Sequence, residues 1–271
     1  MTTTIVAVSD LHAGSTVGLC PPEYDLYEEG RYRANKYQLS LWKRWEAFWH
    51  RAGEIARGRR WIVWNGDLVD GVHHRTTQLV SVNTLDHVGI AAASIRRAVE
   101  IYRPEAMFFV RGTGVHVGDV AQLEEMVAAE FRDTIPYEAP LSRWGAWIET
   151  DGVRFHFAHH TQGWGRPWTK TGAPGRESVM MVANAHAADV GVPDVSVRGH
   201  QHRFNDSGMA THPRVFVLPG WQLMSGFLRK IAPGREPEIG GIIFTVQDGE
   251  YTPHVRRWII PLADELHYRS E

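Results

Sequence analysis

The sequence predicts an α/β fold, a layered domain that contains two sheets. In the first half of the chain, short apolar runs alternate with longer segments whose apolar residues recur at helical spacing. In the second half, two pairs of short runs flank an Asp-Gly step, which is the sequence signal of a β-hairpin. Neither a linker nor an internal repeat interrupts the chain, so we expect a single domain over residues 1–271.

The first half is predicted to alternate strand and helix, an order typical of α/β domains. The expected strands cover residues 3–9, 61–64 and 106–110, and the expected helices cover residues 34–57, 84–102 and 119–131. Asp119, with Gln122 three residues later, predicts a capping box at the start of the third helix. Residues 13–33 form a long polar stretch with several Gly and Pro, which predicts a functional loop.

The second half is predicted to be rich in strands. Alternating runs at 144–150 and 153–158 surround Asp151-Gly152, and runs at 242–246 and 252–260 surround Asp248-Gly249. Further strands are expected at 194–198 and 214–218, a loop at 163–175 and a helix at 178–190. This half therefore completes a second sheet.

Composition limits the functional classes. The chain has 271 residues, of which 43% are hydrophobic, and one cysteine, so it forms a core without an internal disulfide. The net charge of −2 gives no general attraction for nucleic acid. No apolar run resembles a signal peptide or a membrane span, so we expect a soluble cytoplasmic protein with no membrane partner.

Potential metal ligands follow several of the predicted strands. They are Asp10, His12, Asp67, His159, His200 and His202, with the turn Thr113 to His116 after a further strand. Residues i and i+2 leave an extended chain on the same side, so Asp-x-His and His-x-His each aim two ligands at one point. Carboxylate and imidazole ligands favour Mn, Fe or Zn over Ca. A carboxylate such as Asp67 can bridge two ions roughly 3.5–4 Å apart.

These residues carry a resemblance to a known family. The order Asp10-x-His12, Gly66-Asp67-x-x-Asp70, Gly112…His116, His159 and Gly199-His200-x-His202 resembles the metallophosphoesterase (calcineurin-like phosphoesterase) superfamily. The resemblance implies a four-layer α-β-β-α sandwich, with two mixed β-sheets flanked by helices. It also implies that Asp10, His12, Asp67 and His202 hold one divalent ion. Asp67, Thr113, His159 and His200 then hold the other, with Mn expected and Fe or Zn as alternatives.

The chain departs from the family pattern at two points. Thr113 stands where the family has a metal-binding Asn, and two residues separate it from His116. His160 follows His159, so either histidine is a candidate ligand. Such His-His pairs occur in the phosphodiesterase branches of the family, and this favours a diester substrate.

The resemblance therefore implies a dinuclear metal-dependent phosphodiesterase that acts on a nucleotide or a nucleic-acid end. Hydrolysis would use a metal-bound hydroxide, and His116 would protonate the leaving oxygen. One alternative is a phosphomonoesterase for a small molecule or a phosphoprotein. Another is a non-catalytic scaffold that keeps the fold, with Thr113 as the residue in its favour.

The predicted loop at 163–175 interleaves aromatic and basic residues. Trp164, Arg166 and Lys170 are candidate substrate-binding residues, because stacking and cationic side chains suit a base and its phosphates. The alternative is a surface loop anchored by its tryptophans, and the sequence does not separate the two.

Overall fold

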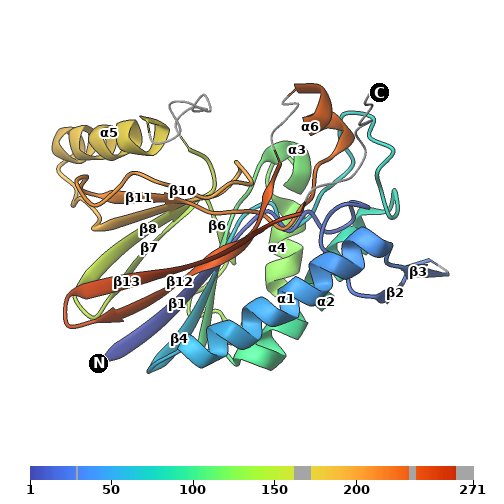
Figure 1. Ribbon diagram of the computed structural model, residues 1–271, viewed down its shortest axis with the longest axis horizontal. Coiled ribbons are helices and arrows are strands. Elements are labelled where there is room, and N and C mark those ends of the chain that lie inside the picture. The colour runs from blue at the N-terminus through green and yellow to red at the C-terminus, as the bar shows by residue number, and fades with distance from the viewer. Residues whose placement is uncertain (29, 162–171, 232–235, 261–271) are drawn as a thin grey trace, which may run out of the picture.

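Two mixed sheets pack face to face and carry helices on their outer faces (Figure 1). The structure, a computed structural model, describes residues 1–28, 30–161, 172–231 and 236–260. One apolar core fills the space between the sheets, and a second lies between the first sheet and its helices. The predicted four-layer α-β-β-α sandwich is therefore confirmed.

The first sheet has six strands in the order β13-β12-β1-β4-β5-β6. Their bounds are Glu250–Ile259, Glu238–Gln247, Thr2–Val8, Arg59–Asn65, Ala106–Val110 and Ser142–Arg143. Strands β1, β4, β5 and β6 run parallel, whereas β12 and β13 are antiparallel to their neighbours. Helices α1 (Lys36–Ile55), α2 (Thr84–Tyr102) and α4 (Gln122–Ala129) cover its outer face. The parallel strands thus end at the same edge.

The second sheet has five strands in the order β10-β11-β9-β8-β7. Their bounds are Asn205–Asp206, Arg214–Val217, Val195–Arg198, Val153–Ala158 and Gly145–Thr150. Helix α5 (Gly172–Ala188) lies over its outer face, where Glu177 pairs with the buried Arg198 of β9. Strands β8 and β9 run parallel and also end side by side.

The remaining short elements lie around the loops. They are the hairpin β2 (Glu23–Asp25) with β3 (Arg31–Arg33), α3 (Gly114–Val117), a 3-10 turn at Arg132–Thr134 and α6 (Gly226–Ile231). Among the described residues, none of the helices combines the length and apolar character that crossing a membrane requires.

Two local predictions were wrong. Helix α4 is preceded by Ala121, and Asp119 makes no cap, because a tight turn at Gly118 to Ala121 separates it from the helix. Helix α5 begins at Gly172, inside the stretch predicted to be a loop, since its glycines and proline lie in the first turn. The capping box of the first half lies instead at Asn35, whose side chain accepts from the backbone of Gln38.

A cluster of buried tryptophans joins α1 to the first sheet and to the loop after β11. Trp45 packs edge-to-face on Trp49 and Trp221, with ring centroids 5.3 and 4.7 Å apart, and Trp49 packs on Trp64 at 5.6 Å. All four are fully buried, and the indole of Trp45 donates to the carbonyl of Ser94 at 3.0 Å. The backbone N–H of Trp221 donates to the carbonyl of Asp10, which ties this core to the candidate site.

Replacing Trp45 tests the contribution of this cluster. We expect Trp45→Ala to lower the free energy of unfolding by about 3–5 kcal/mol, because a large ring is lost from a packed core. Urea denaturation followed by circular dichroism measures the change. Trp147, about half exposed on β7, is the matched control, and Trp147→Ala should stay within about 0.5 kcal/mol of wild type. Equal losses in both variants would contradict the assigned role.

Candidate metal centre

The predicted ligands gather where the strands of both sheets end. Asp10 and His12 follow β1, Asp67 follows β4, Thr113 follows β5, His159 follows β8, and His200 and His202 follow β9. The turns are bonded to one another, since the N–H groups of Asp10 and His12 donate to the carbonyls of Gly66 and Asp67. The fold thus brings residues 10 to 202 to one point.

The local backbone is not the extended chain that the sequence argument assumed. Positive φ angles occur at Asp10 (58°), His12 (44°), Asp67 (53°), His200 (68°) and His202 (49°). A left-handed conformation is uncommon for residues other than glycine, and clusters of such residues mark functional sites. The two side chains of Asp-x-His and of His-x-His therefore converge because the backbone turns at both residues after the strand ends. The predicted residues are unchanged, but the extended backbone used to predict their convergence is wrong.

The first group of ligands is Asp10, His12 and His202. Nε2 of His202 lies 3.2 Å from Oδ1 of Asp10, and the two Nε2 atoms of His12 and His202 are 3.1 Å apart. All three side chains are buried. Together they form one set that could hold a cation.

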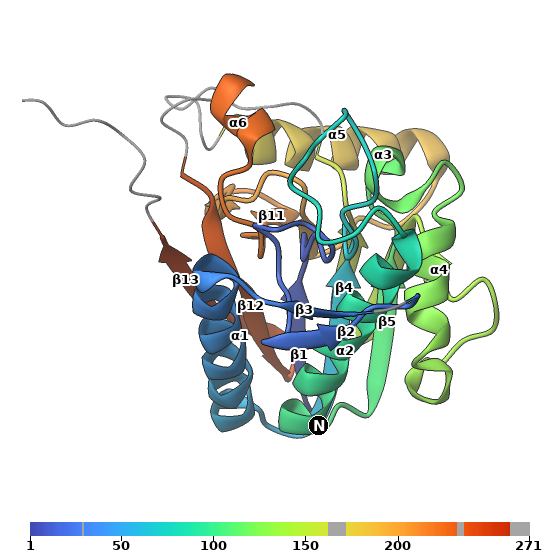
Figure 2. The same cartoon turned by 90° about the vertical axis from the view of Figure 1, so that its right-hand side faces the viewer.

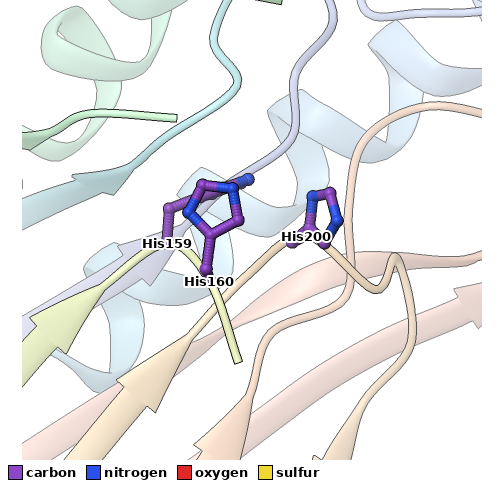
Figure 3. A group of neighbouring side chains, drawn as sticks. All are labelled: His159, His160 and His200. Atoms are coloured by element: carbon purple, nitrogen blue, oxygen red, sulfur yellow. The ribbon is translucent and has the colours of Figure 1, made fainter. Parts of the chain in front are cut away.

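The second group surrounds Asp67. Nε2 of His159 lies 3.0 Å from Oδ2 of Asp67, and Nδ1 of His200 lies 3.9 Å from the same oxygen. The hydroxyl of Thr113 donates to that oxygen at 3.1 Å. Figure 3 shows the rings of His159, His160 and His200 facing one another from the ends of β8 and β9. Both His159 and His160 are thus within reach, the former buried and the latter exposed.

Asp10, Asp67 and His159 form a third set that joins the two groups. Nε2 of His159 is 3.9 Å from Oδ1 of Asp10, and both atoms are buried without a hydrogen-bond partner. Buried polar atoms are nearly always paired, so two unpaired atoms of this kind fit a bound cation. Oxygen and imidazole donors suit borderline divalent ions. The residues present therefore fit a pair of divalent cations.

Glycine is required at the base of the site. A Cβ at Gly112 would lie 2.2 Å from both the backbone nitrogen and Oδ1 of Asp67. The absence of a side chain there lets the turn after β5 approach the carboxylate, so that the N–H of Thr113 donates to Oδ1 of Asp67 at 2.6 Å.

Comparison with known proteins gives structural likeness without sequence matches. No protein-family profile matches the chain, and no curated protein does. A Vps29 mutant from Entamoeba histolytica aligns at 10% identity over 95% of this chain and 99% of its own, with a TM-score of 0.43. Vps29 from Chaetomium thermophilum is 13% identical over 96% of this chain and 100% of its own, with a TM-score of 0.42. A dimetal phosphatase from Danio rerio is 10% identical over 95% of this chain and 98% of its own, with a TM-score of 0.44. These figures describe chain path and do not bear on the reaction.

The turns that carry the predicted ligands lie close together, as the motifs predict. The chain has a four-layer α-β-β-α sandwich fold, the architecture that the resemblance implied.

Two of the candidate ligands are oriented through their second ring nitrogen. Nδ1 of His12 donates to Oδ1 of Asp70 at 2.9 Å, and Nδ1 of His159 donates to the carbonyl of Asn65 at 2.7 Å. The amide of Gln222 also donates to Asp70 at 3.2 Å. Such partners fix the tautomer and leave Nε2 free to bind a cation. Asp70 therefore orients the ring of His12.

Glu124 is a site residue that the sequence analysis missed. Its fully buried carboxylate accepts from the N–H groups of Leu68 and Gly112, at 3.1 and 2.6 Å, and so joins the turns that carry Asp67 and Thr113. Burial, with the nearby charge of Asp67, raises the pKa of Glu124 to about 8. A glutamate in the first turn of an amphipathic helix gives no sequence signal, because most such residues are solvated.

His116 lies in α3 and lines the same cavity as the metal ligands. Its Nδ1 donates to the carbonyl of Asp70 at 2.8 Å, and its ring packs edge-on against His12 at 4.6 Å. Burial and the charge of His12 lower the pKa of His116 to about 4. At neutral pH the ring is therefore uncharged and carries its proton on Nδ1. The other predicted substrate residues, Trp164, Arg166 and Lys170, lie outside the described residues.

The charges of the site compensate one another. Burial would raise the pKa of Asp10 and Asp67, but His202 and His159 hold both well below the usual range. Burial would lower the pKa of His12, but the neighbouring carboxylates of Asp10 and Asp70 raise it to about 10. Burial would likewise lower the pKa of His159, but the charges of Asp67 and Asp10 raise this pKa to about 10. Without a cation, protons on these imidazoles balance the carboxylates.

Metal binding should therefore displace protons. The folded, metal-free chain holds protons on His12 and His159 more tightly than the unfolded chain. The stability from these protons is fully present below pH 6.5 and is lost as the pH rises through about 10. Mn²⁺ affinity should rise about tenfold per pH unit for each proton released within that window. Calorimetry in buffers of different ionisation enthalpy measures the release. His50→Asn, at an exposed position on α1, is the control and should change nothing. An Mn²⁺ affinity that does not change with pH, together with no proton release, would contradict the ligand assignment.

Proposed function

We propose that the protein is a dinuclear metal-dependent phosphoesterase and that its substrate is a phosphodiester. The observation that carries this proposal is the set Asp10, Asp67 and His159, which brings one carboxylate of each ligand group within reach of the same histidine. Asp10, His12, Asp67 and His202 would hold one ion. Asp67, Thr113, His200 and either His159 or His160 would hold the other. Two bound cations would supply charge neutralisation on the phosphoryl oxygens and a more acidic attacking water, and Mn²⁺ is the ion we expect.

The Thr113 substitution weakens but does not remove the second set of ligands. Its hydroxyl lies within 3.3 Å of His160 and 3.2 Å of His200 as well as on Asp67. It therefore occupies the centre of that set, and His160 adds a nitrogen that compensates for the missing amide oxygen. This arrangement supports retained metal binding over a scaffold role.

His116 is the residue we assign to proton transfer. Its Nδ1 proton is held by the carbonyl of Asp70, which leaves the lone pair of Nε2 available. Nε2 would accept a proton from the attacking water and pass it to the leaving oxygen, and the lowered pKa keeps the ring neutral before the reaction. His73 packs edge-on against His116 at 4.4 Å and restricts the rotation of its ring.

The size of the cavity favours a diester over a monoester. The cavity beside the ligands has a volume of about 610 Å³, within the range of sites that enclose whole organic ligands. A phosphate group fills a small part of that volume. The remainder leaves room for substituents on both ester oxygens.

Hydrolysis of chromogenic esters tests the function. With Mn²⁺ added, we expect faster turnover of bis(p-nitrophenyl) phosphate than of p-nitrophenyl phosphate. Asp67→Asn should lower that turnover by at least about 10²-fold and reduce bound Mn²⁺, because both ligand groups lose their shared carboxylate. Asp133→Asn, at an exposed site, is the control. The reverse substrate ratio would support a monoesterase. Failure to bind metal or turn over either ester would support a scaffold.

A separate series of substrates tests His116. Removing a proton donor slows the departure of a basic leaving group more than that of an acidic one. His116→Gln should therefore lower kcat about 10²-fold or more for a diester with an alkyl leaving group. The loss of kcat should be much smaller for a diester with a p-nitrophenyl leaving group. Equal losses for the two leaving groups would exclude His116 from protonating the leaving oxygen.

A further inference from the structure

The cavity continues beyond the metal ligands into a part that the proposed reaction does not use. This outer part is lined by the loop at residues 73–78 and by α6. In both views these two segments lie at the same end of the molecule (Figure 1, Figure 2). Gln78 joins them, since its side-chain oxygen accepts from the N–H of Gly226 at 2.6 Å.

An aromatic pair stands at this outer part. The rings of His74 and Phe227 are nearly parallel, with an interplanar angle of 3° and centroids 5.2 Å apart. Phe227 is nevertheless 47% exposed, and His74 is exposed as well. A flat ring that is half exposed to solvent at the mouth of this cavity offers a stacking surface for another flat ring.

The charges of the outer part are of one sign. Arg75 and Lys230 line it, whereas the carboxylates among the described lining residues are Asp67 and Asp70, which belong to the candidate metal centre. Arg75 and Lys230 are exposed. The chain as a whole has a net charge of −2, so this concentration of cations is local. It suits an anionic group on the substrate, in addition to the phosphate that reacts.

The loop that carries these groups is fixed in place. His74 and Arg75 both have positive φ angles, 47° and 52°, a costly conformation for two consecutive residues with side chains. The loop is bonded to the turn after β1, because the N–H of Thr16 donates to the carbonyl of Gln78 and the N–H of Val80 to that of Gly14. His74 and Arg75 therefore lie on a loop that backbone hydrogen bonds hold to the turn after β1.

We propose that this outer part binds the leaving side of a single-stranded nucleic acid. An unpaired base stacks on His74 and Phe227, and the next phosphate pairs with Arg75 and Lys230. The inference rests on the proposed phosphodiesterase function and names its substrate class. A paired base would not expose its face to the aromatic pair, so single strands are favoured over duplex.

Two measurements on the full-length chain test the subsite separately from the reaction. The first is the fluorescence anisotropy of fluorescein-labelled hexathymidylate in EDTA, where no turnover takes place. The second is kcat/KM with Mn²⁺ for hexathymidylate and for methyl p-nitrophenyl phosphate, a diester too small to reach the outer part. Phe227→Ala and Arg75→Ala are the variants, and both change exposed side chains.

We expect each variant to weaken binding of hexathymidylate about tenfold and to lower its kcat/KM similarly. The small diester should change by less than about twofold, since the metal ligands are intact. Trp147→Ala and Arg256→Ala are matched controls on exposed positions of β7 and β13 and should match wild type.

The outcomes separate the two proposals. Unchanged hexathymidylate binding in both variants, or equal affinity for a six-base-pair duplex, would overturn the subsite even if the small diester is hydrolysed. Hydrolysis of neither substrate by the wild type would overturn the proposed reaction. Binding that falls in Phe227→Ala and Arg75→Ala would still support the subsite in that case.

Discussion

The structure depends on one buried carboxylate held among imidazoles. Asp67 receives the N–H and the hydroxyl of Thr113 and lies against His159, and its charge has no access to water. An isolated buried carboxylate is too costly to persist, so its surroundings must supply positive charge. The fold meets this requirement with residues from both sheets. The two sheets are thus held at a common edge by the charge balance as well as by the apolar core.

The supporting structure explains how such a site stays fixed. Trp221 links the tryptophan cluster to the backbone of Asp10, and Glu124 joins the turns after β4 and β5 from the helical side. Asp70 and the carbonyl of Asn65 fix the rings of His12 and His159. The ligands therefore lie on turns whose backbones are bonded to one another, and this rigidity holds the nitrogen and oxygen atoms at metal-binding separations without a cation.

Much of the site could be predicted from the sequence, because ligands at strand ends follow short apolar runs and come in pairs. Asp10 with His12 and His200 with His202 are of this kind, although their left-handed backbone was not foreseen. The roles of Glu124 and Gln222 could not be predicted, since each depends on contacts between distant turns that no local pattern records. The start of α5 was misplaced because Gly and Pro tolerate a first helical turn as well as a loop.

The left-handed angles at the ligand residues also limit which sequences can keep this shape. Asn and Asp tolerate that region, whereas alanine and the β-branched residues are strained there. Truncating Asp10 or Asp67 to alanine would remove a donor and distort a turn at once, so that loss of metal and loss of local shape would be confounded. Amide replacements keep the backbone preference and change the charge alone. For this protein, isosteric exchange is the way to separate chemistry from architecture.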